Sequence, residues 1–159
     1  MDYQNKKIYR ITHYKNLQWI LENGLWCSNS KTQDPNFIQI GNKVLISSRK
    51  DKPVKVHGSN VLKGTLSDYV PFYFCPRPPM LYNIITGYDV EKQIQSELIY
   101  IVSSLKSIRD ENLEFVFSNG HAKEEISKFY DDLNSLNKID WDVIRSNTWK
   151  NDPLRNIKS

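Results

Sequence analysis

The chain has 159 residues, enough for one ordinary domain and too few for two of the usual size. Its 39% hydrophobic and 25% charged residues are typical of a globular chain and argue against disorder. Two cysteines exclude a disulfide framework, and three histidines without ligand spacing predict no metal. The apolar runs are too short to span a membrane and the N-terminus lacks a signal-peptide core, so we expect a cytoplasmic protein. The net charge of +4 permits an anionic partner but does not require one.

Two regular elements are expected at the start of the chain. Residues 7–12 are rich in β-branched and aromatic types, which predicts a strand. Apolar side chains then recur at helical spacing over residues 17–21, and Gly24 stands where such a helix would end. The pattern is lost over residues 26–64, which are expected to be irregular and either functional or mobile.

Apolar runs predict three strands in the second half of the chain. The first, over residues 69–75, is the most apolar and is ended by prolines, while the others cover residues 98–102 and 113–117. Between the first two, Pro79 is placed to begin a helix that Gly87 ends.

Two helices are expected near the C-terminus. Apolar residues at helical spacing over residues 122–136 predict an amphipathic helix, and Asp140 can cap a short helix after it. Strands and helices are interspersed without regular βαβ alternation, which favours a single α+β domain over residues 1–159.

Three polar residues around the end of the first strand are candidates for a ligand site. His13 and Asn16 fall between the predicted strand and helix, where they can either face a ligand or cap and pack the helix. Arg10 lies within the strand and points away from the side of Ile11. In a cleft, Arg10 would suit a phosphate or carboxylate; facing outward, it would be a solvated charge.

Further candidates are cations and histidines outside this strand. The stretch SSRKDKPVK is either a solvated loop or a contact to phosphates. Arg77 stands between two prolines, whose rigid frame would fix its direction. His57 and His121 permit a nuclease hypothesis in which one acts as base and the other as acid.

Four segments together resemble one known family. The opening YRITHYKNLQWILENGL resembles the opening signature of the DarT family, the toxin half of DarT–DarG toxin–antitoxin pairs. LSDYVPFYFCPRPPMLY is close to the most specific segment of that family, and FVFSNGHA and IDWDVIRSNTWKNDPLR match in order and spacing. The resemblance covers nearly the whole chain.

The resemblance implies a fold, a reaction and partners. The fold is that of the ADP-ribosyltransferases, a small split β-sheet flanked by helices with NAD+ in a central cleft. The reaction is transfer of ADP-ribose from NAD+ to a thymine or guanine of single-stranded DNA. NAD+ is thus a co-substrate, no metal is implied, and the expected partners are single-stranded DNA and a macrodomain antitoxin like DarG.

The resemblance also implies site residues. Arg49 best matches the catalytic arginine, with Lys50 as an alternative match, and residues 34–50 would cover NAD+. The residues implied to bind NAD+ are Arg10, Ile11, Thr12, His13, Asn16, Trp19, Cys27 and Arg49, of which the first three would contact the nicotinamide end. The residues implied to bind DNA are Arg77, Lys50 and Trp149, from a target loop at about residues 119–159.

Rings in that target loop have two interpretations. They can stack on unpaired bases while cations hold the strand, or they can pack the last helix onto the core. We expect Trp141 in the core and leave both interpretations open for Trp149.

The chain departs from the family at its end. The family's catalytic glutamate lies in a Gln-Ala-Glu stretch shortly after the equivalent of Lys158, and this chain stops at Ser159. We therefore expect the glutamate and the closing strands beyond residue 159, and expect the chain as given to transfer ADP-ribose poorly. A carboxylate is needed because positive charge develops on the ribose carbon as the nicotinamide bond breaks. The alternatives are a non-catalytic remnant that binds NAD+ or nucleic acid, and an unrelated small nuclease or RNA-binding domain.

Overall fold

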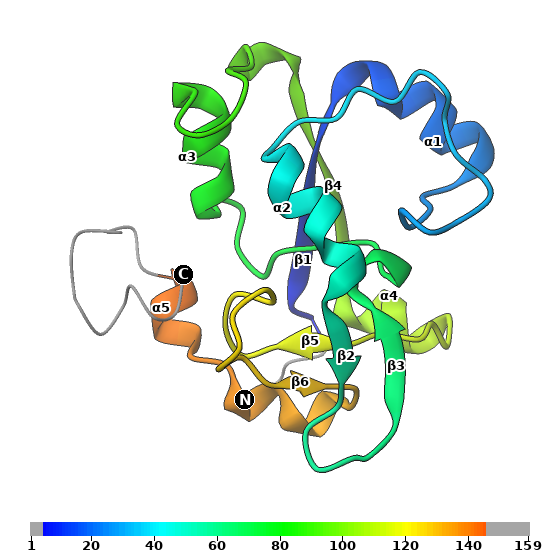
Figure 1. Cartoon of the computed structure of the whole chain (residues 1–159), viewed down its shortest axis with the longest axis vertical. Coiled ribbons are helices and arrows are strands. Elements are labelled where there is room, and N and C mark those ends of the chain that lie inside the picture. The colour runs from blue at the N-terminus through cyan, green and yellow to red at the C-terminus, as the bar shows by residue number, and fades with distance from the viewer. Residues whose placement is uncertain (1–4, 146–159) are drawn as a thin grey trace.

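The computed structural model describes residues 5–145. Its longest strands are β1 (Lys7–His13) and β4 (Leu98–Ser104), which pair antiparallel with Lys7 opposite Ser104 and His13 opposite Leu98. Figure 1 shows these two strands side by side along the length of the molecule. The strands expected at residues 7–12 and 98–102 are therefore confirmed.

Four shorter strands form the second part of the sheet structure. β2 (Pro53–Lys55) pairs with β3 (Leu62–Thr65), and β5 (Phe117–Ser118) pairs with β6 (Phe129–Tyr130), both antiparallel. One isolated parallel bridge, between Val56 just after β2 and Phe129 in β6, links these two otherwise separate pairs. The β-structure is thus divided in two, and the expected α+β class is confirmed.

Short helices surround these strands. The α-helices are α1 (Leu17–Asn23), α2 (Lys43–Ser47), α3 (Pro79–Thr86), α4 (Leu105–Asp110) and α5 (Trp141–Arg145). The 3-10 helices are η1 (Tyr14–Asn16), η2 (Ser48–Asp51), η3 (Leu66–Asp68), η4 (Gln95–Glu97) and η5 (Leu133–Lys138). Figure 1 places α1 and α3 at one end of the molecule and β2, β3, β5 and β6 at the other. Within the described residues, no helix is long and apolar enough to cross a bilayer.

The helix ends follow local sequence signals. Gly24 and Gly87 terminate α1 and α3 at φ angles of 89° and 80°, which favour glycine. Pro79 begins α3, and the N–H of Val143 donates to the side chain of Asp140 at the start of α5. All three predicted helices that carry such signals are confirmed.

The main core lies between α4, α5 and the second group of strands. Its buried members are Ile8, Leu105, Phe117, Tyr130, Leu136, Ile139 and Trp141. Trp141 is 7% exposed, and its indole N–H donates to the carbonyl of Leu136 at 2.9 Å. Its expected core position is confirmed.

The predicted core strand over residues 69–75 is wrong. The segment makes one antiparallel bridge, between Tyr73 and Tyr9, whose two N–H···O bonds are 2.7 and 2.8 Å long. Pro71 has no N–H to donate, so the ladder cannot extend in that direction. Phe74 packs against the main core, so the apolar run reflects burial of side chains and not a continuous ladder.

The predicted amphipathic helix over residues 122–136 is also wrong, because β6 and η5 occupy this segment. Phe129 and Tyr130 are both buried, and both pair with β5 in an antiparallel ladder. Ile126, on the expected apolar face, is 62% exposed. The side chain of Asp132 accepts two backbone N–H groups and so begins η5.

Two other expectations are partly wrong. Residues 26–64, expected to be irregular, contain α2, η2, β2 and β3, and the side chain of Asn42 accepts the N–H of Leu45 to begin α2. The strand expected at residues 113–117 is reduced to β5. The helices α2 and η2 and the strands β2, β3 and β5 are each too short for hydrophobic periodicity to reveal them.

Candidate functional site

Arg10 extends from the middle of β1 toward Tyr73. Its Nη1 donates to the carbonyl of Pro71 at 3.1 Å, and its Nε is buried without a hydrogen-bond partner. Ile11 points to the other face of the strand and packs in the core with Ile40. The side chain of Arg10 therefore contacts the segment around Pro71, and the side chain of Ile11 lies in the core.

Arg49 approaches Tyr73 from η2. Its Nη2 donates to the carbonyls of Leu66 and Tyr69, at 2.6 and 3.3 Å. Both arginines therefore hold the backbone of the irregular segment that carries Tyr73. The structure brings together Arg10 and Arg49, which the sequence analysis placed in one site.

The electrostatics of this cluster, Arg10, Arg49 and Tyr73, are unusual. The pKa of Arg10 is lowered to about 10, first by burial and then by the nearby charge of Arg49, while Tyr73 partly opposes both effects. Burial likewise lowers the pKa of Arg49 and raises the pKa of Tyr73 above its ordinary value. At neutral pH the cluster thus holds two cations and an uncharged phenol. No carboxylate among the described residues contributes to the pKa of either arginine.

Thr12 and Asn16 form a buried latch beneath the loop over residues 26–42. Asn16 is 1% exposed, and its amide donates to the Thr12 hydroxyl at 3.0 Å and to the carbonyl of Ile38 at 2.8 Å. Its Oδ1 accepts the N–H of Ile38 at 2.8 Å. Asn16 therefore shapes this region by fixing the loop, because its own polar atoms are already used.

His13 makes the contacts of a capping residue. Its Nδ1 accepts the N–H of Lys15 at 3.2 Å, and its Nε2 lies 3.5 Å from Oε2 of Glu97. The ring stacks on Tyr14 with centroids 5.0 Å apart, and the residue is 4% exposed. These contacts agree with the capping and packing interpretation that the sequence left open.

A second tie holds the loop after α1. The N–H of Asn29 donates to the carbonyl of Ser67 at 3.1 Å, and its side-chain amide donates to Asp68 Oδ1 at 2.6 Å. The same carboxylate accepts the N–H of Thr65 at 2.7 Å. The loop is thus fixed at residue 29 to η3 and at residue 38 to Asn16.

The turn over residues 121–124 packs against η2. Lys123 Nζ donates to the carbonyl of Ser48 at 2.9 Å, and Lys52 Nζ donates to the carbonyl of Glu124 at 3.2 Å. Burial lowers the pKa of His121. Glu124 partly opposes this shift by raising the pKa, whereas Lys123 and Arg49 lower it further by smaller amounts. A neutral His121 thus lies in the electrostatic field of Arg49.

The two histidines of the nuclease hypothesis face different groups. His57 is exposed, and its ring lies edge-on to Tyr130 with centroids 5.7 Å apart. His121 instead has Arg49 and Lys123 as neighbours. This arrangement does not supply an acid–base pair.

The remaining predicted site residues are dispersed. Trp19 on α1 and Cys27 after it are half-buried, and no contact of their side chains with the arginine cluster is found within residues 5–145. Lys50 is exposed beside Arg49 in η2, and Arg77 is exposed before α3. Trp149 lies outside the described residues. In the part of the chain that the structure describes, no three His, Cys, Asp or Glu side chains gather as a metal site would require.

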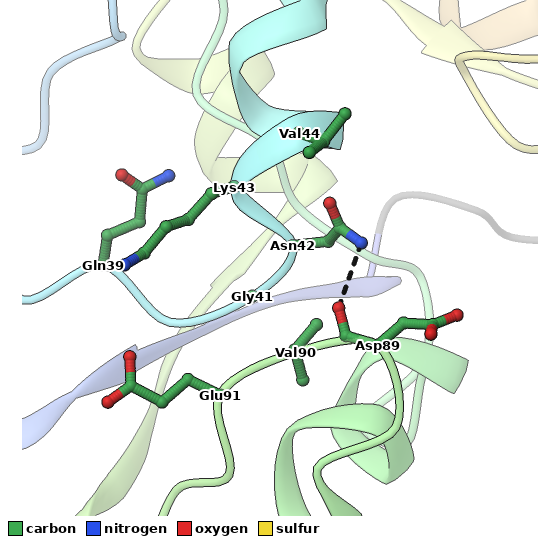
Figure 2. A pocket seen from close by; sticks show the side chains of 8 residues that line it. All are labelled: Gln39, Gly41, Asn42, Lys43, Val44, Asp89, Val90 and Glu91. Carbon is green, nitrogen blue, oxygen red and sulfur yellow. Dashed lines mark hydrogen bonds between the residues drawn. The ribbon is translucent and has the colours of Figure 1, made fainter.

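A pocket of about 340 Å³ lies between the loop before α2 and the loop after α3. Figure 2 shows Gln39 and Lys43 on one side and Val90 and Glu91 on the other, with Asn42 donating to the carbonyl of Asp89 at 3.2 Å. None of the predicted NAD+-binding residues lines it. The pocket is therefore separate from the arginine cluster.

Comparison with known proteins identifies the family. Residues 9–159 match the family model described as "ssDNA thymidine ADP-ribosyltransferase, DarT". The chain belongs to the DarT family. It is 42% identical over 151 residues to a DNA ADP-ribosyl transferase of Escherichia coli O127:H6, and 35% identical over 145 residues to one of Thermus aquaticus. These matches cover 94% and 91% of this chain and 67% and 63% of the relatives, so the chain spans about two thirds of their length.

Solved DarT structures share its fold. Thermus sp. 2.9 DarT in complex with ADP-ribosylated single-stranded DNA matches with a TM-score of 0.84 and 34% identity, over 97% of this chain and 71% of that one. The same protein in complex with NAD+ matches with a TM-score of 0.78 and 34% identity, over 98% and 72%. The expected ADP-ribosyltransferase fold is confirmed over the matched length.

Sequence reasoning missed two parts of this region. Tyr73 lies in an apolar run and was assigned to the core, although its half-buried phenol lies among two arginines. Asn29 and Asp68 are residue types that are common in turns, so the sequence indicates loops at these positions but does not indicate that the two loops contact each other. The position of Tyr73 between two prolines, Pro71 and Pro76, was the available signal against a regular core strand.

Proposed function

We propose that this protein transfers ADP-ribose from NAD+ to a thymine of single-stranded DNA, as the toxin of a toxin–antitoxin pair. The observation that carries the proposal is the backbone match, at a TM-score of 0.84, to a DarT that was solved with ADP-ribosylated single-stranded DNA. Thymine is favoured over guanine because the matching family model is described by thymidine. Residues 1–159 are proposed to belong to one transferase domain.

NAD+ is proposed to lie along the end of β1, beneath the loop over residues 26–42. Arg10 and Thr12 lie on one face of that strand, and Thr12 is joined to the loop by Asn16. Ile11, His13, Trp19 and Cys27 complete the proposed set around this strand and loop. Ile11 and His13 would shape the pocket without a polar contact from their side chains to NAD+. The side chain of Ile11 lies in the core, and the ring of His13 is already close to Glu97.

The proposed reaction exchanges one C–N bond for another. The bond between ribose C1′ and the nicotinamide nitrogen breaks, nicotinamide leaves with the electron pair, and a base nitrogen attacks C1′ and gives up its proton. A carboxylate stabilises the positive charge on C1′, and we place it beyond the residues described here. Arg49 is the proposed catalytic arginine. Because both arginines stay protonated at neutral pH, their contribution is to hold negative charge.

Single-stranded DNA is proposed to approach from the side of η2. Lys50 is exposed next to Arg49, and Arg77 is exposed at the end of the segment that carries Tyr73. Trp149 is proposed to stack on an unpaired base. A DarG-like macrodomain protein is the proposed antitoxin.

The decisive test uses the full gene product with NAD+ and single-stranded oligonucleotides that either contain or lack thymine. Mass spectrometry should detect one added ADP-ribosyl group on the thymine-containing strand alone. Arg49→Ala should reduce transfer by about 10²-fold or more, since a donor aimed at transition-state charge contributes that much. Arg109→Ala is the matched control, because Arg109 is an exposed arginine paired with Asp110 on α4. Lack of transfer by a folded protein that binds NAD+ would refute the proposal.

A further inference from the structure

The geometry points to a phosphate clamp: Arg10 and Arg49, which both donate to backbone carbonyls of residues 66–71, together bind one phosphate group of the substrate. This inference rests on the proposed function and deepens it by naming the chemical group that the cluster recognises. The phosphate can come from the pyrophosphate of NAD+ or from a phosphodiester of the DNA strand. Arg10 is thereby given a role distinct from contact with the nicotinamide ring.

The first observation is that the donors of both arginines are largely unused. A guanidinium carries five N–H donors. Within the described residues, Arg10 makes one hydrogen bond, from Nη1 to the carbonyl of Pro71, and its buried Nε makes none. Arg49 makes its hydrogen bonds through Nη2 alone. Buried donors are normally paired, so the buried, unpaired Nε of Arg10 indicates a missing acceptor.

The second observation is that neither arginine has a carboxylate counter-ion within residues 5–145. The ion pairs found within residues 5–145 lie elsewhere and involve His13, Lys63, Lys106 and Arg109. Arg10 and Arg49 instead repel each other in a site with reduced access to water. Two like charges in such a site are unfavourable unless an anion joins them. A ligand with negative charge relieves this repulsion and gains charge-assisted hydrogen bonds.

The third observation concerns Tyr73. Burial keeps its phenol protonated, so that it can donate a hydrogen bond. Its hydroxyl now donates to the thioether of Met80 at 3.2 Å, and a thioether is a weak acceptor. A phosphate oxygen is a much stronger acceptor, so the hydroxyl can exchange partners when a ligand binds. The cluster thus offers two planar forks and one hydroxyl, a set of donors suited to a tetrahedral oxyanion.

The competing interpretation is purely structural. Both arginines donate to carbonyls of residues 66–71, so they could serve only to hold that segment. Substitution Arg10→Gln separates the two interpretations, because an amide can still donate to the carbonyl of Pro71 but carries no charge. Arg10→Lys keeps the charge and loses the fork. Arg109→Gln is the matched control, since it removes one charge from an exposed residue on α4.

The experiment titrates the 159-residue chain and these variants with inorganic pyrophosphate at constant ionic strength, with binding followed by calorimetry. The wild-type chain and Arg109→Gln should bind alike, and Arg10→Gln should bind roughly 10- to 100-fold more weakly, the loss expected for charge-assisted hydrogen bonds. Arg10→Lys should fall between them. Circular dichroism establishes that each variant is folded, and if Arg10→Gln is not, Arg10→Lys against Arg109→Gln decides the outcome.

Two further arms identify the source of the phosphate. Nicotinamide riboside, which has no phosphate, should bind Arg10→Gln and the wild-type chain alike. A selective loss of affinity for NAD+ assigns the pyrophosphate, and a selective loss for an oligonucleotide, abolished by methylphosphonate linkages, assigns the strand. Equal affinity of Arg10→Gln and Arg109→Gln for pyrophosphate, NAD+ and DNA overturns the inference, as does a wild-type chain that does not bind pyrophosphate. Arg10-dependent phosphate binding without ADP-ribose transfer by the full gene product would instead overturn the proposed function alone.

Discussion

Asn16 should be the residue on which the loop over residues 26–42 depends most. Substitution Asn16→Ala removes three hydrogen bonds at once, two with the backbone of Ile38 and one with the hydroxyl of Thr12. Water has little access to the space that the Asn16 side chain occupies, because Asn16 is 1% exposed. The substitution therefore leaves the N–H and carbonyl of Ile38 and the Thr12 hydroxyl without their partners.

The expected loss of stability follows from how well each freed group can reach water. An unsatisfied buried polar group costs about 1–3 kcal/mol. Thr12 is 1% exposed, so its hydroxyl should carry a full cost, whereas half-buried Ile38 can recover part of its loss by binding water. We expect a total of about 2–4 kcal/mol, which for a domain of this size lowers the melting temperature by roughly 2–4 °C per kcal/mol.

Three measurements test this expectation. Thermal or urea unfolding gives the change in stability, hydrogen exchange reports the protection of the Ile38 amide, and calorimetry reports NAD+ binding, which should weaken because the loop is released. Asn36→Ala is the control, since Asn36 is exposed in the same loop and the hydrogen bond found for it uses its backbone N–H. Equal melting temperatures and equal Ile38 protection in the two variants would refute the latch.

Three other substitutions test separate parts of the structure. Trp141→Ala should destabilise the protein by about 3–5 kcal/mol, as expected for truncation of a buried aromatic. Trp141→Phe should be less destabilising, because it keeps a buried ring and loses the indole hydrogen bond to Leu136. Equal unfolding curves for all three proteins would contradict the core assignment. The pKa of Asp68 should lie below its ordinary value of 3.8, first because the Asn29 amide donates to the carboxylate and then because the Thr65 N–H does. The contribution of Asp68 to stability is therefore present above pH 3.8 and is lost as the pH falls through the lower pKa of the folded protein. Carboxyl NMR should show this pKa rise toward 3.8 in Asn29→Ala, and an unchanged value would exclude the tie between the loop and η3. Gly64→Ala should lower the free energy of unfolding by about 1 kcal/mol or more, measured by chemical unfolding, because φ is +72° there and a Cβ would lie 2.5 Å from Asp68 Oδ2. Gly58→Ala is the control: its φ is also positive, at +81°, but a Cβ there meets nothing within 4 Å.

Elements marked by local chemistry could be predicted from the sequence. Gly24 and Gly87 end helices because a left-handed or otherwise unusual φ is needed there, and Pro79 begins one because its missing N–H is not needed at that position. The two long strands could be predicted equally well, since β-branched and aromatic residues are frequent over their seven positions. These signals act over a few residues and do not depend on the rest of the fold.

Elements that depend on distant partners could not be predicted. Phe129 and Tyr130 fit a helical stripe by spacing, but their burial comes from pairing with β5 and from the bridge to Val56. The run around Tyr73 resembled a core strand because periodicity reports burial, not which backbone groups find partners. In both segments tertiary contacts override the local pattern.

The same limit applies to the candidate site and explains what it contains. Alternation along β1 was enough to place Arg10 and Thr12 on one face, but only the fold shows that Arg49 reaches that face from η2. Thr12 is neutral, buried and fully bonded through Asn16, whereas Arg10 on the same face is charged and keeps unused donors. A strand that serves packing alone would not be expected to keep a largely buried guanidinium with an unpaired Nε, because burying such a charge is costly. This cost is offset if a substrate anion binds between the two arginines. In that case Asn16 positions the loop over residues 26–42, and Arg10 and Arg49 bind the substrate that this loop covers.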